Sequence, residues 1–123
     1  MARLSMLTPD QLDPDLRRRS RVDDRTPLEQ GLTRIFGHQP AMAEGLSSFA
    51  ASLKVARTLP ERMIELVRLR VAFHNQCRSC MAIRYPDAVD DGLTEELVCS
   101  LERPMEADDL DDRERTAIRF GEL

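Results

Sequence analysis

The stretch ELVRLRVAFHNQCRSCMAIR, Glu65–Arg84, decides the fold and holds the residues whose type and spacing point to chemistry. Apolar side chains cover most of the circumference of its first half, which predicts a central, deeply buried helix from Pro60 to about Asn75. Cys77 and Cys80 follow as a CxxC pair. Two thiols at this spacing can close a disulfide or share a metal ion.

The residues His74, Asn75 and Gln76 predict a break in that helix, after which Asn75 or Gln76 caps the next one. The two cysteines then lie in the first turn of the new helix, where free backbone N–H groups and the helix dipole favour a thiolate. Pro86 cannot stay inside a regular helix without the loss of a hydrogen bond. The new helix therefore either kinks there, or stops at Tyr85 and restarts at Pro86.

The rest of the chain predicts helices and no strands, so we expect an all-α protein of five to six helices. Residues 1–26 have scattered acids and no sustained apolar period, and they predict a mobile N-terminal arm. Residues 27–123 predict one helical domain, in which Thr94 has the character of an N-cap and either Asp111 or Asp112 caps the last helix. An apolar stripe at helical spacing predicts a helix packed on a core; its members are Met42, Leu46, Phe49, Leu53 and Ala56.

Length and charge limit the functions that this chain can have. The 123 residues suffice for one core, and no apolar run is long enough to cross a membrane. The N-terminus lacks the apolar segment of a signal peptide, so we expect a cytoplasmic protein whose thiols rest reduced. Residues 86–114 hold twelve acids against two arginines, and acids flank the arginine run at residues 17–21. Nucleic acid and membranes are therefore not expected as partners.

The cysteines and histidines do not predict a metal site. His74 joins the CxxC pair at HxxCxxC spacing, but structural zinc takes four ligands, and only Cys99 and His38 remain, both distant in sequence. The apolar neighbours of Cys99 predict a buried, inert thiol. A short structural disulfide adds little stability and is rare in a reducing compartment. A redox dithiol without metal or other cofactor is therefore the favoured interpretation.

A spacing of glutamate, eleven residues, cysteine, two residues, cysteine, three residues and histidine occurs in the alkylhydroperoxidase D and carboxymuconolactone decarboxylase family. Glu65, Cys77 and Cys80 fit it, and Arg84 stands in place of the histidine. The order of an apolar helix, the thiol pair, a second helix and a Gly-Leu-Thr-Glu-Glu helix start also resembles that family over residues 58–122. Since the family usually continues with further helices, we expect a domain that is short at its C-terminus.

This resemblance implies an alkylhydroperoxidase D-like helical fold that assembles as a homo-oligomer, a trimer or a multiple of one. It also implies a thiol-dependent peroxidase or disulfide oxidoreductase. In that chemistry Cys80 attacks a hydroperoxide, Cys77 resolves the sulfenic acid into a disulfide, and a lipoyl-bearing protein or another dithiol reduces it. Glu65 is then the acid that orients the proton relay. The decarboxylase branch generally lacks the CxxC pair, so lactone chemistry is not expected.

Arg84 leaves two functions open. A guanidinium stays charged and cannot take the thiol proton as histidine does. On a continuous helix Arg84 shares a face with Cys80, where its charge favours the thiolate, and His74 or Glu65 then carries the proton in a working peroxidase. Alternatively Glu65 pairs with Arg84, and the protein is a redox-sensing or non-catalytic oligomer that has lost the relay. A purely structural role for Glu65 is an i, i+3 ion pair with Arg68 on a partly exposed face of its own helix.

Overall fold

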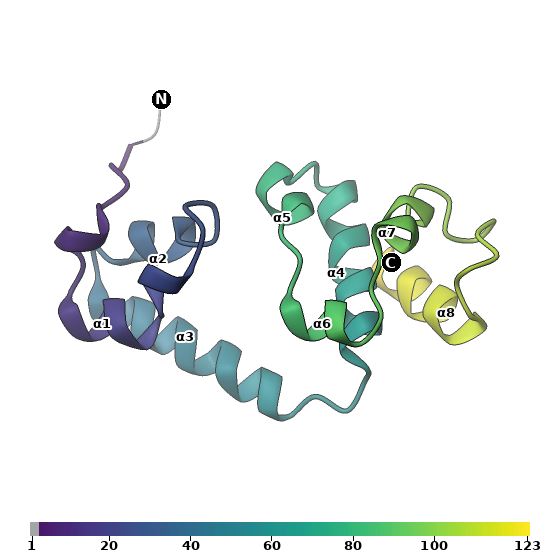
Figure 1. The fold of residues 1–123 in the computed structure, drawn as a ribbon, viewed down its shortest axis with the longest axis horizontal. Coiled ribbons are helices and arrows are strands. Elements are labelled where there is room, and N and C mark those ends of the chain that lie inside the picture. Colours follow the sequence, from purple (N-terminus) through teal and green to yellow (C-terminus); the bar gives the residue numbers. More distant parts are fainter. Residues whose placement is uncertain (1–2) are drawn as a thin grey trace. The chain divides into compact units, whose positions relative to one another are not determined.

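A computed structural model describes residues 3–123 as helices joined by turns, with no strand in that part of the chain (Figure 1). The predicted all-α fold is therefore confirmed. The chain divides into two compact units, Met1–Arg57 and Thr58–Leu123, and the CxxC stretch lies in the second. This division after Arg57 differs from the boundary expected after residue 26.

In the first unit, two 3-10 helices, η1 (Pro9–Gln11) and η2 (Val22–Asp24), accompany the α-helices α1 (Pro14–Arg19), α2 (Gly31–Phe36) and α3 (Pro40–Val55). The second unit contains α4 (Glu61–His74), α5 (Arg78–Ala82), α6 (Pro86–Asp90), α7 (Glu95–Ser100) and α8 (Asp112–Gly121). The eight α-helices of the described residues exceed the five or six expected. Pro86 separates α5 from α6, and α1 lies within the segment predicted to be an arm.

Part of that predicted arm packs on the start of α3. Asp13 caps α1, since its carboxylate accepts hydrogen bonds from the main-chain N–H groups of Asp15 and Leu16, both at 3.0 Å. Leu16 joins a small buried cluster, whose other members are Leu12, Val22 and Ala43. Leu12 and Leu16 are only one helical turn apart, and Val22 and Ala43 lie farther along the chain, so no sustained apolar period in the sequence indicates that the four gather.

Each arginine in the run at residues 17–21 forms an ion pair with an acid; the pairs are Arg17 with Asp10 and Asp23, Arg18 with Asp15, Arg19 with Glu44, and Arg21 with Asp24. The hydrogen bonds from Arg17 hold the pKa of the Asp23 carboxyl below its ordinary value. Because their charges are matched, these arginines offer little positive field to a polyanion.

The apolar stripe of α3 is exposed, contrary to the expectation from its period. Met42, Leu46, Phe49 and Leu53 each keep between 45 and 61% of their surface exposed. Ala43 is the one buried residue of α3, and it lies about 100° around the helix from the stripe. The core of the first unit is too small to cover a helix of 16 residues. Neither α3 nor any other helix within residues 3–123 is long and apolar enough to cross a membrane.

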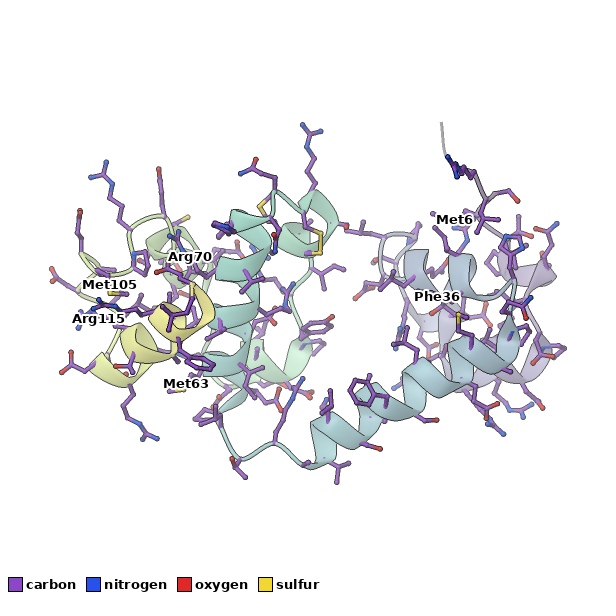
Figure 2. The ribbon with its side chains drawn as sticks, turned by 180° about the vertical axis from the view of Figure 1, so that it is seen from behind. Met6, Phe36, Met63, Arg70, Met105 and Arg115 are labelled. Atoms are coloured by element: carbon purple, nitrogen blue, oxygen red, sulfur yellow. A yellow bond between two sulfur atoms is a disulfide. The ribbon has the colours of Figure 1, made fainter. Side chains whose placement is uncertain are left out.

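In the second unit, α4 lies against α5, α6 and α8 and has more buried residues than any other described helix, as its apolar coverage predicts. Leu66 and Leu69 are fully buried in a cluster completed by Ala88, Leu93, Leu97, Val98, Leu101, Leu110 and Ile118. Arg70, labelled in Figure 2, ties the C-terminal half of α4 to its neighbours. It donates to the Leu101 carbonyl at 2.8 Å and to the Glu122 carboxylate at 2.6 Å.

A buried ion pair fastens the start of α4 to α8. Glu114 is 5% exposed, and its carboxylate accepts hydrogen bonds from Arg62 Nε at 2.7 Å and Nη2 at 3.0 Å. The same carboxylate accepts from the Asp111 N–H, while the Asp111 side chain accepts from the Glu114 N–H, which makes a capping box. The N-cap predicted at Thr94 is confirmed, and of the two candidates Asp111 and Asp112 the structure selects Asp111.

Candidate redox site

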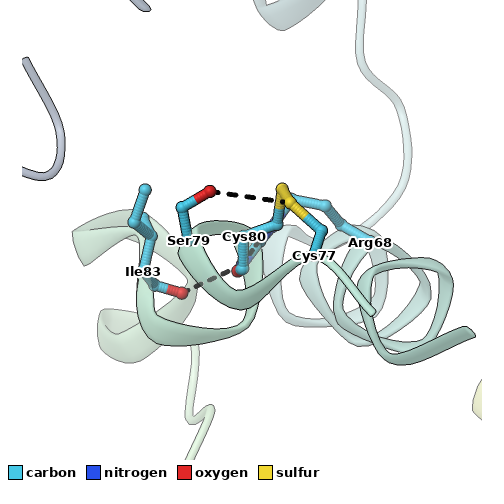
Figure 3. Close-up of a disulfide and its surroundings, with 5 residues drawn as sticks. All are labelled: Arg68, Cys77, Ser79, Cys80 and Ile83. Atoms are coloured by element: carbon cyan, nitrogen blue, oxygen red, sulfur yellow. Dashed lines mark hydrogen bonds between the residues drawn. A yellow bond between two sulfur atoms is a disulfide. The ribbon is translucent and has the colours of Figure 1, made fainter. Parts of the chain in front are cut away.

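The cysteine pair lies on the turn that leads from α4 into α5. Gln76 adopts a left-handed conformation, with φ 54°, and the Cys77 N–H donates to the Ala72 carbonyl at 3.0 Å. Cys77 and Cys80 are joined by a disulfide, with their Cα atoms 5.3 Å apart, and both residues are half-buried. The Ser79 hydroxyl lies 3.6 Å from the Cys77 sulfur, and a dashed line marks this contact in Figure 3. Because both cysteines are only half-buried, part of the disulfide surface is open to a small reactant.

Cys77 is itself the N-cap of α5, whereas the sequence suggested Asn75 or Gln76. Asn75 still belongs to the end of α4, because its N–H donates to the Val71 carbonyl at 3.0 Å. Gln76 is occupied as the left-handed residue that redirects the chain. Since α5 has only five residues, few peptide dipoles align behind the cysteines, and the dipole favours a thiolate less than a long helix would.

Glu65 lies on the buried side of α4 and is bound by Arg68. It is 2% exposed, and its two carboxylate oxygens accept hydrogen bonds from Arg68 Nε and Nη2, each at 2.6 Å. Of the partners considered for Glu65, the structure selects the arginine three residues along the same helix, and Arg84 contacts a different acid. Both oxygens of Glu65 are thus occupied by a cation.

Arg68 is the site residue whose role sequence reasoning missed. Its Nη1 donates to the Cys80 carbonyl at 2.7 Å and its Nη2 to the Ile83 carbonyl at 3.0 Å. Its guanidinium also lies over the Tyr85 ring, 5.1 Å from the ring centre. The available signal was its position, since Arg68 shares the less apolar face of α4 with Glu65, the face on which the cysteine turn comes back.

Arg84 does not lie on a continuous helix with Cys80, so that expectation is wrong. Helix α5 ends at Ala82, and Ile83 is extended. Tyr85 is extended as well, because helical geometry is disfavoured for the residue before a proline, and α6 begins at Pro86. Arg84 Nε and Nη2 donate to the two carboxylate oxygens of Glu95 at 2.8 and 3.1 Å. The charge of Arg84 is therefore matched by an acid at the start of α7.

Cys99 is exposed, not buried as the sequence suggested. Leu97, Val98 and Leu101 take the inward face of this turn, and at 100° per residue Cys99 lies about 150° from the centre of that face. The angular position of Cys99 on its helix can be worked out from the sequence alone. The prediction of a buried thiol was wrong because it took apolar neighbours in the sequence as a sign of burial.

The two histidines belong to different units of the chain. His74 is exposed in the last turn of α4. His38 belongs to the first unit, where its Nε2 lies 2.8 Å from the Ser5 carbonyl. Within residues 3–123 no three side chains of the metal-binding types are placed to hold one ion.

Fold and site together define a helical protein that carries a CxxC disulfide on the turn after its most buried helix. The chain belongs to the carboxymuconolactone decarboxylase family, whose profile matches residues 40–122, more than half of its 123 residues. The family resemblance inferred from the spacing is thereby confirmed. Comparison with curated proteins and with solved structures gives no significant match.

Proposed function

We propose that the protein is a thiol-dependent peroxidase or disulfide oxidoreductase that reduces hydroperoxides through the Cys77–Cys80 pair. The observation that supports this proposal is the disulfide on a half-buried turn. A closed disulfide is the state that such an enzyme reaches after it has reduced one peroxide.

The chemistry assigns one step to each cysteine. The Cys80 thiolate attacks a peroxide oxygen, the O–O bond breaks, the alcohol leaves with one proton, and Cys80 becomes a sulfenic acid. The Cys77 thiol then attacks that sulfur, which forms the disulfide and releases water. A dithiol, such as a lipoyl-bearing protein of the cytoplasm, returns two electrons and two protons by thiol–disulfide exchange.

The proton steps proceed without the family's histidine. A guanidinium does not act as a general base, and that of Arg84 already pairs with Glu95. Glu65 is held by Arg68 through both carboxylate oxygens. We therefore assign the proton transfer to His74, which is exposed on the last turn of α4, close in sequence to the pair.

A second function is favoured by the same two ion pairs. If neither Glu65 nor Arg84 can move a proton, the CxxC pair still exchanges with other disulfides but turns over peroxide slowly. The protein is then a redox-sensing member of its family, in which the state of the Cys77–Cys80 pair is the signal.

Peroxide turnover separates the two functions. The reduced protein is expected to consume cumene hydroperoxide in the presence of dihydrolipoamide, and Cys80→Ser should abolish this because the nucleophile is lost. Cys77→Ser should stop after one peroxide and leave a sulfenic acid that dimedone traps. Cys99→Ser is the matched control and should keep the wild-type rate. Reversible oxidation without turnover supports the sensor, and full turnover by Cys80→Ser contradicts the assigned roles.

We also propose that the protein assembles as a homo-oligomer, a trimer or a multiple of one, because the α3 stripe is exposed in a single chain. Light scattering at micromolar concentration should give at least three times the chain mass of 14.0 kDa. Phe49→Glu, within the stripe, should lower that mass. Val55→Glu, on the opposite face of α3, should leave it unchanged. A wild-type mass of one chain would refute the assembly.

A further inference from the structure

Arg68 holds the segment that leaves the cysteine pair at three points. Its guanidinium donates to the Cys80 carbonyl at 2.7 Å and to the Ile83 carbonyl at 3.0 Å (Figure 3). Its Cζ lies 5.1 Å from the centre of the Tyr85 ring. One side chain of α4 therefore fixes the end of α5 and the extended residues that follow it.

Glu65 fixes the guanidinium that makes these contacts. Arg68 Nε and Nη2 donate to separate oxygens of Glu65, which is 2% exposed and so has little freedom to move. A guanidinium gripped at two points has one orientation, and its remaining N–H groups are then aimed at the two carbonyls. The carboxylate also offsets the charge of Arg68, so the pair brings little net charge to the sulfurs.

These contacts matter most when the disulfide is open. In the oxidised protein the S–S bond itself keeps Cys77 and Cys80 together. Once it is reduced, α5 has only five residues and none of them is buried, so neither its length nor its packing holds it firmly. The bonds from Arg68 to the Cys80 and Ile83 carbonyls then carry that task, beside those that Arg84 donates to the Met81 and Ile83 carbonyls. The disulfide and the hydrogen bonds from Arg68 favour the same geometry of the two cysteines, so each stabilises the other.

We propose that Arg68, anchored by Glu65, is a positioning residue that keeps the reduced cysteines in the geometry of the disulfide and thereby sets the reduction potential of the pair. This inference rests on the redox role proposed above. It gives Glu65 a different task from the proton relay, because the carboxylate acts on the cysteines through Arg68.

Loss of Arg68 is expected to make the disulfide easier to reduce. Coupling between linked events is typically 5- to 150-fold, and for Arg68→Gln we expect the equilibrium constant for disulfide formation to fall about tenfold. For a two-electron couple this makes the potential less negative by about 30 mV. A purely electrostatic role predicts the opposite sign, because removal of a positive charge destabilises the thiolates. Arg68→Lys keeps the charge but cannot form the fork, so it should shift as Arg68→Gln does.

The test equilibrates the full-length protein in dithiothreitol redox buffers at neutral pH and counts free thiols by alkylation and mass spectrometry. Arg70→Gln is the matched control, since Arg70 lies on the same helix and also donates to one carboxylate and one main-chain carbonyl, away from the cysteines. Circular dichroism establishes that each variant is folded. Arg68→Lys supplies the answer if Arg68→Gln does not fold.

The inference holds if the potentials of the Arg68 variants become less negative while Arg70→Gln keeps the wild-type value. It is overturned if the Arg68 variants keep the wild-type potential, move to more negative values, or move no further than Arg70→Gln. The measurement uses no peroxide. A protein that fails to turn over peroxide therefore refutes the proposed function and leaves the result for Arg68 intact.

Discussion

Replacing Arg84 by histidine is expected to raise peroxide turnover about 100-fold at mildly alkaline pH, the lower end of what positioned acid–base groups contribute. The spacing that the sequence resembles has histidine at this position, where the present chain has Arg84. A neutral imidazole can take the proton of the Cys80 thiol and return it to the leaving alkoxide. Arginine cannot do either, because it stays charged.

The gain should depend on pH. Only the neutral imidazole acts as a base, so the gain should be small well below a pKa of about 6.5 and grow as the pH rises through it. Glu95, now paired with Arg84, favours the protonated imidazole and should move that rise to higher pH. Arg84→Gln is the control, because it removes the guanidinium and adds no base. Equal turnover by both variants at every pH would count against a proton relay at residue 84.

Replacing Glu114 by alanine is expected to lower the free energy of unfolding by about 3 kcal/mol, since it removes one partner of a buried ion pair. Arg62 is left with its charge in a site where its side chain is only 29% exposed. The Asp111 N–H loses its acceptor in the capping box as well. We expect the lower end of the usual range because Arg62 can still reach water.

Urea denaturation at equilibrium, followed by far-UV circular dichroism, measures this loss. Glu122→Ala is the matched control, since Glu122 also pairs with an arginine of α4, at 2.6 Å, but both side chains are about one-third exposed. Such a pair contributes roughly 1 kcal/mol or less. If the two variants lose equal stability, burial does not distinguish the two ion pairs.

Local signals in the sequence predict most of the second unit. The apolar coverage of α4, the caps at Thr94 and Asp111 and the restart at Pro86 each depend on residues within a turn or two of one another. The exposed apolar stripe of α3 shows what such local signals do not predict. A helical period says that one face is apolar, but what covers that face depends on parts of the chain that the period does not describe.

The candidate site also has parts that the sequence predicts and parts that it does not. Cys77 and Cys80 are recognisable from spacing alone, and their pairing on a turn agrees with it. The sequence places Arg68 on the helix face of Glu65, but it does not reveal the bonds from Arg68 to two carbonyls, because these exist only once Gln76 has turned the chain back toward α4. The predicted position of Arg84 was wrong for a related reason. The direction of its side chain depends on whether the helix that contains Cys80 continues to Pro86, and α5 ends at Ala82.

The contacts of Arg68 also bear on how the chain folds as it is made. Its two carbonyl partners lie 12 and 15 residues further along, whereas Arg62 must find Glu114 at a separation of 52. Contacts between residues close in sequence need smaller loops to close, and they form sooner. Synthesis adds to this order, because α4 and α5 leave the ribosome before α8 does. The two thiols are thus brought together on an unfinished chain, and their oxidation can precede completion of the second unit's core.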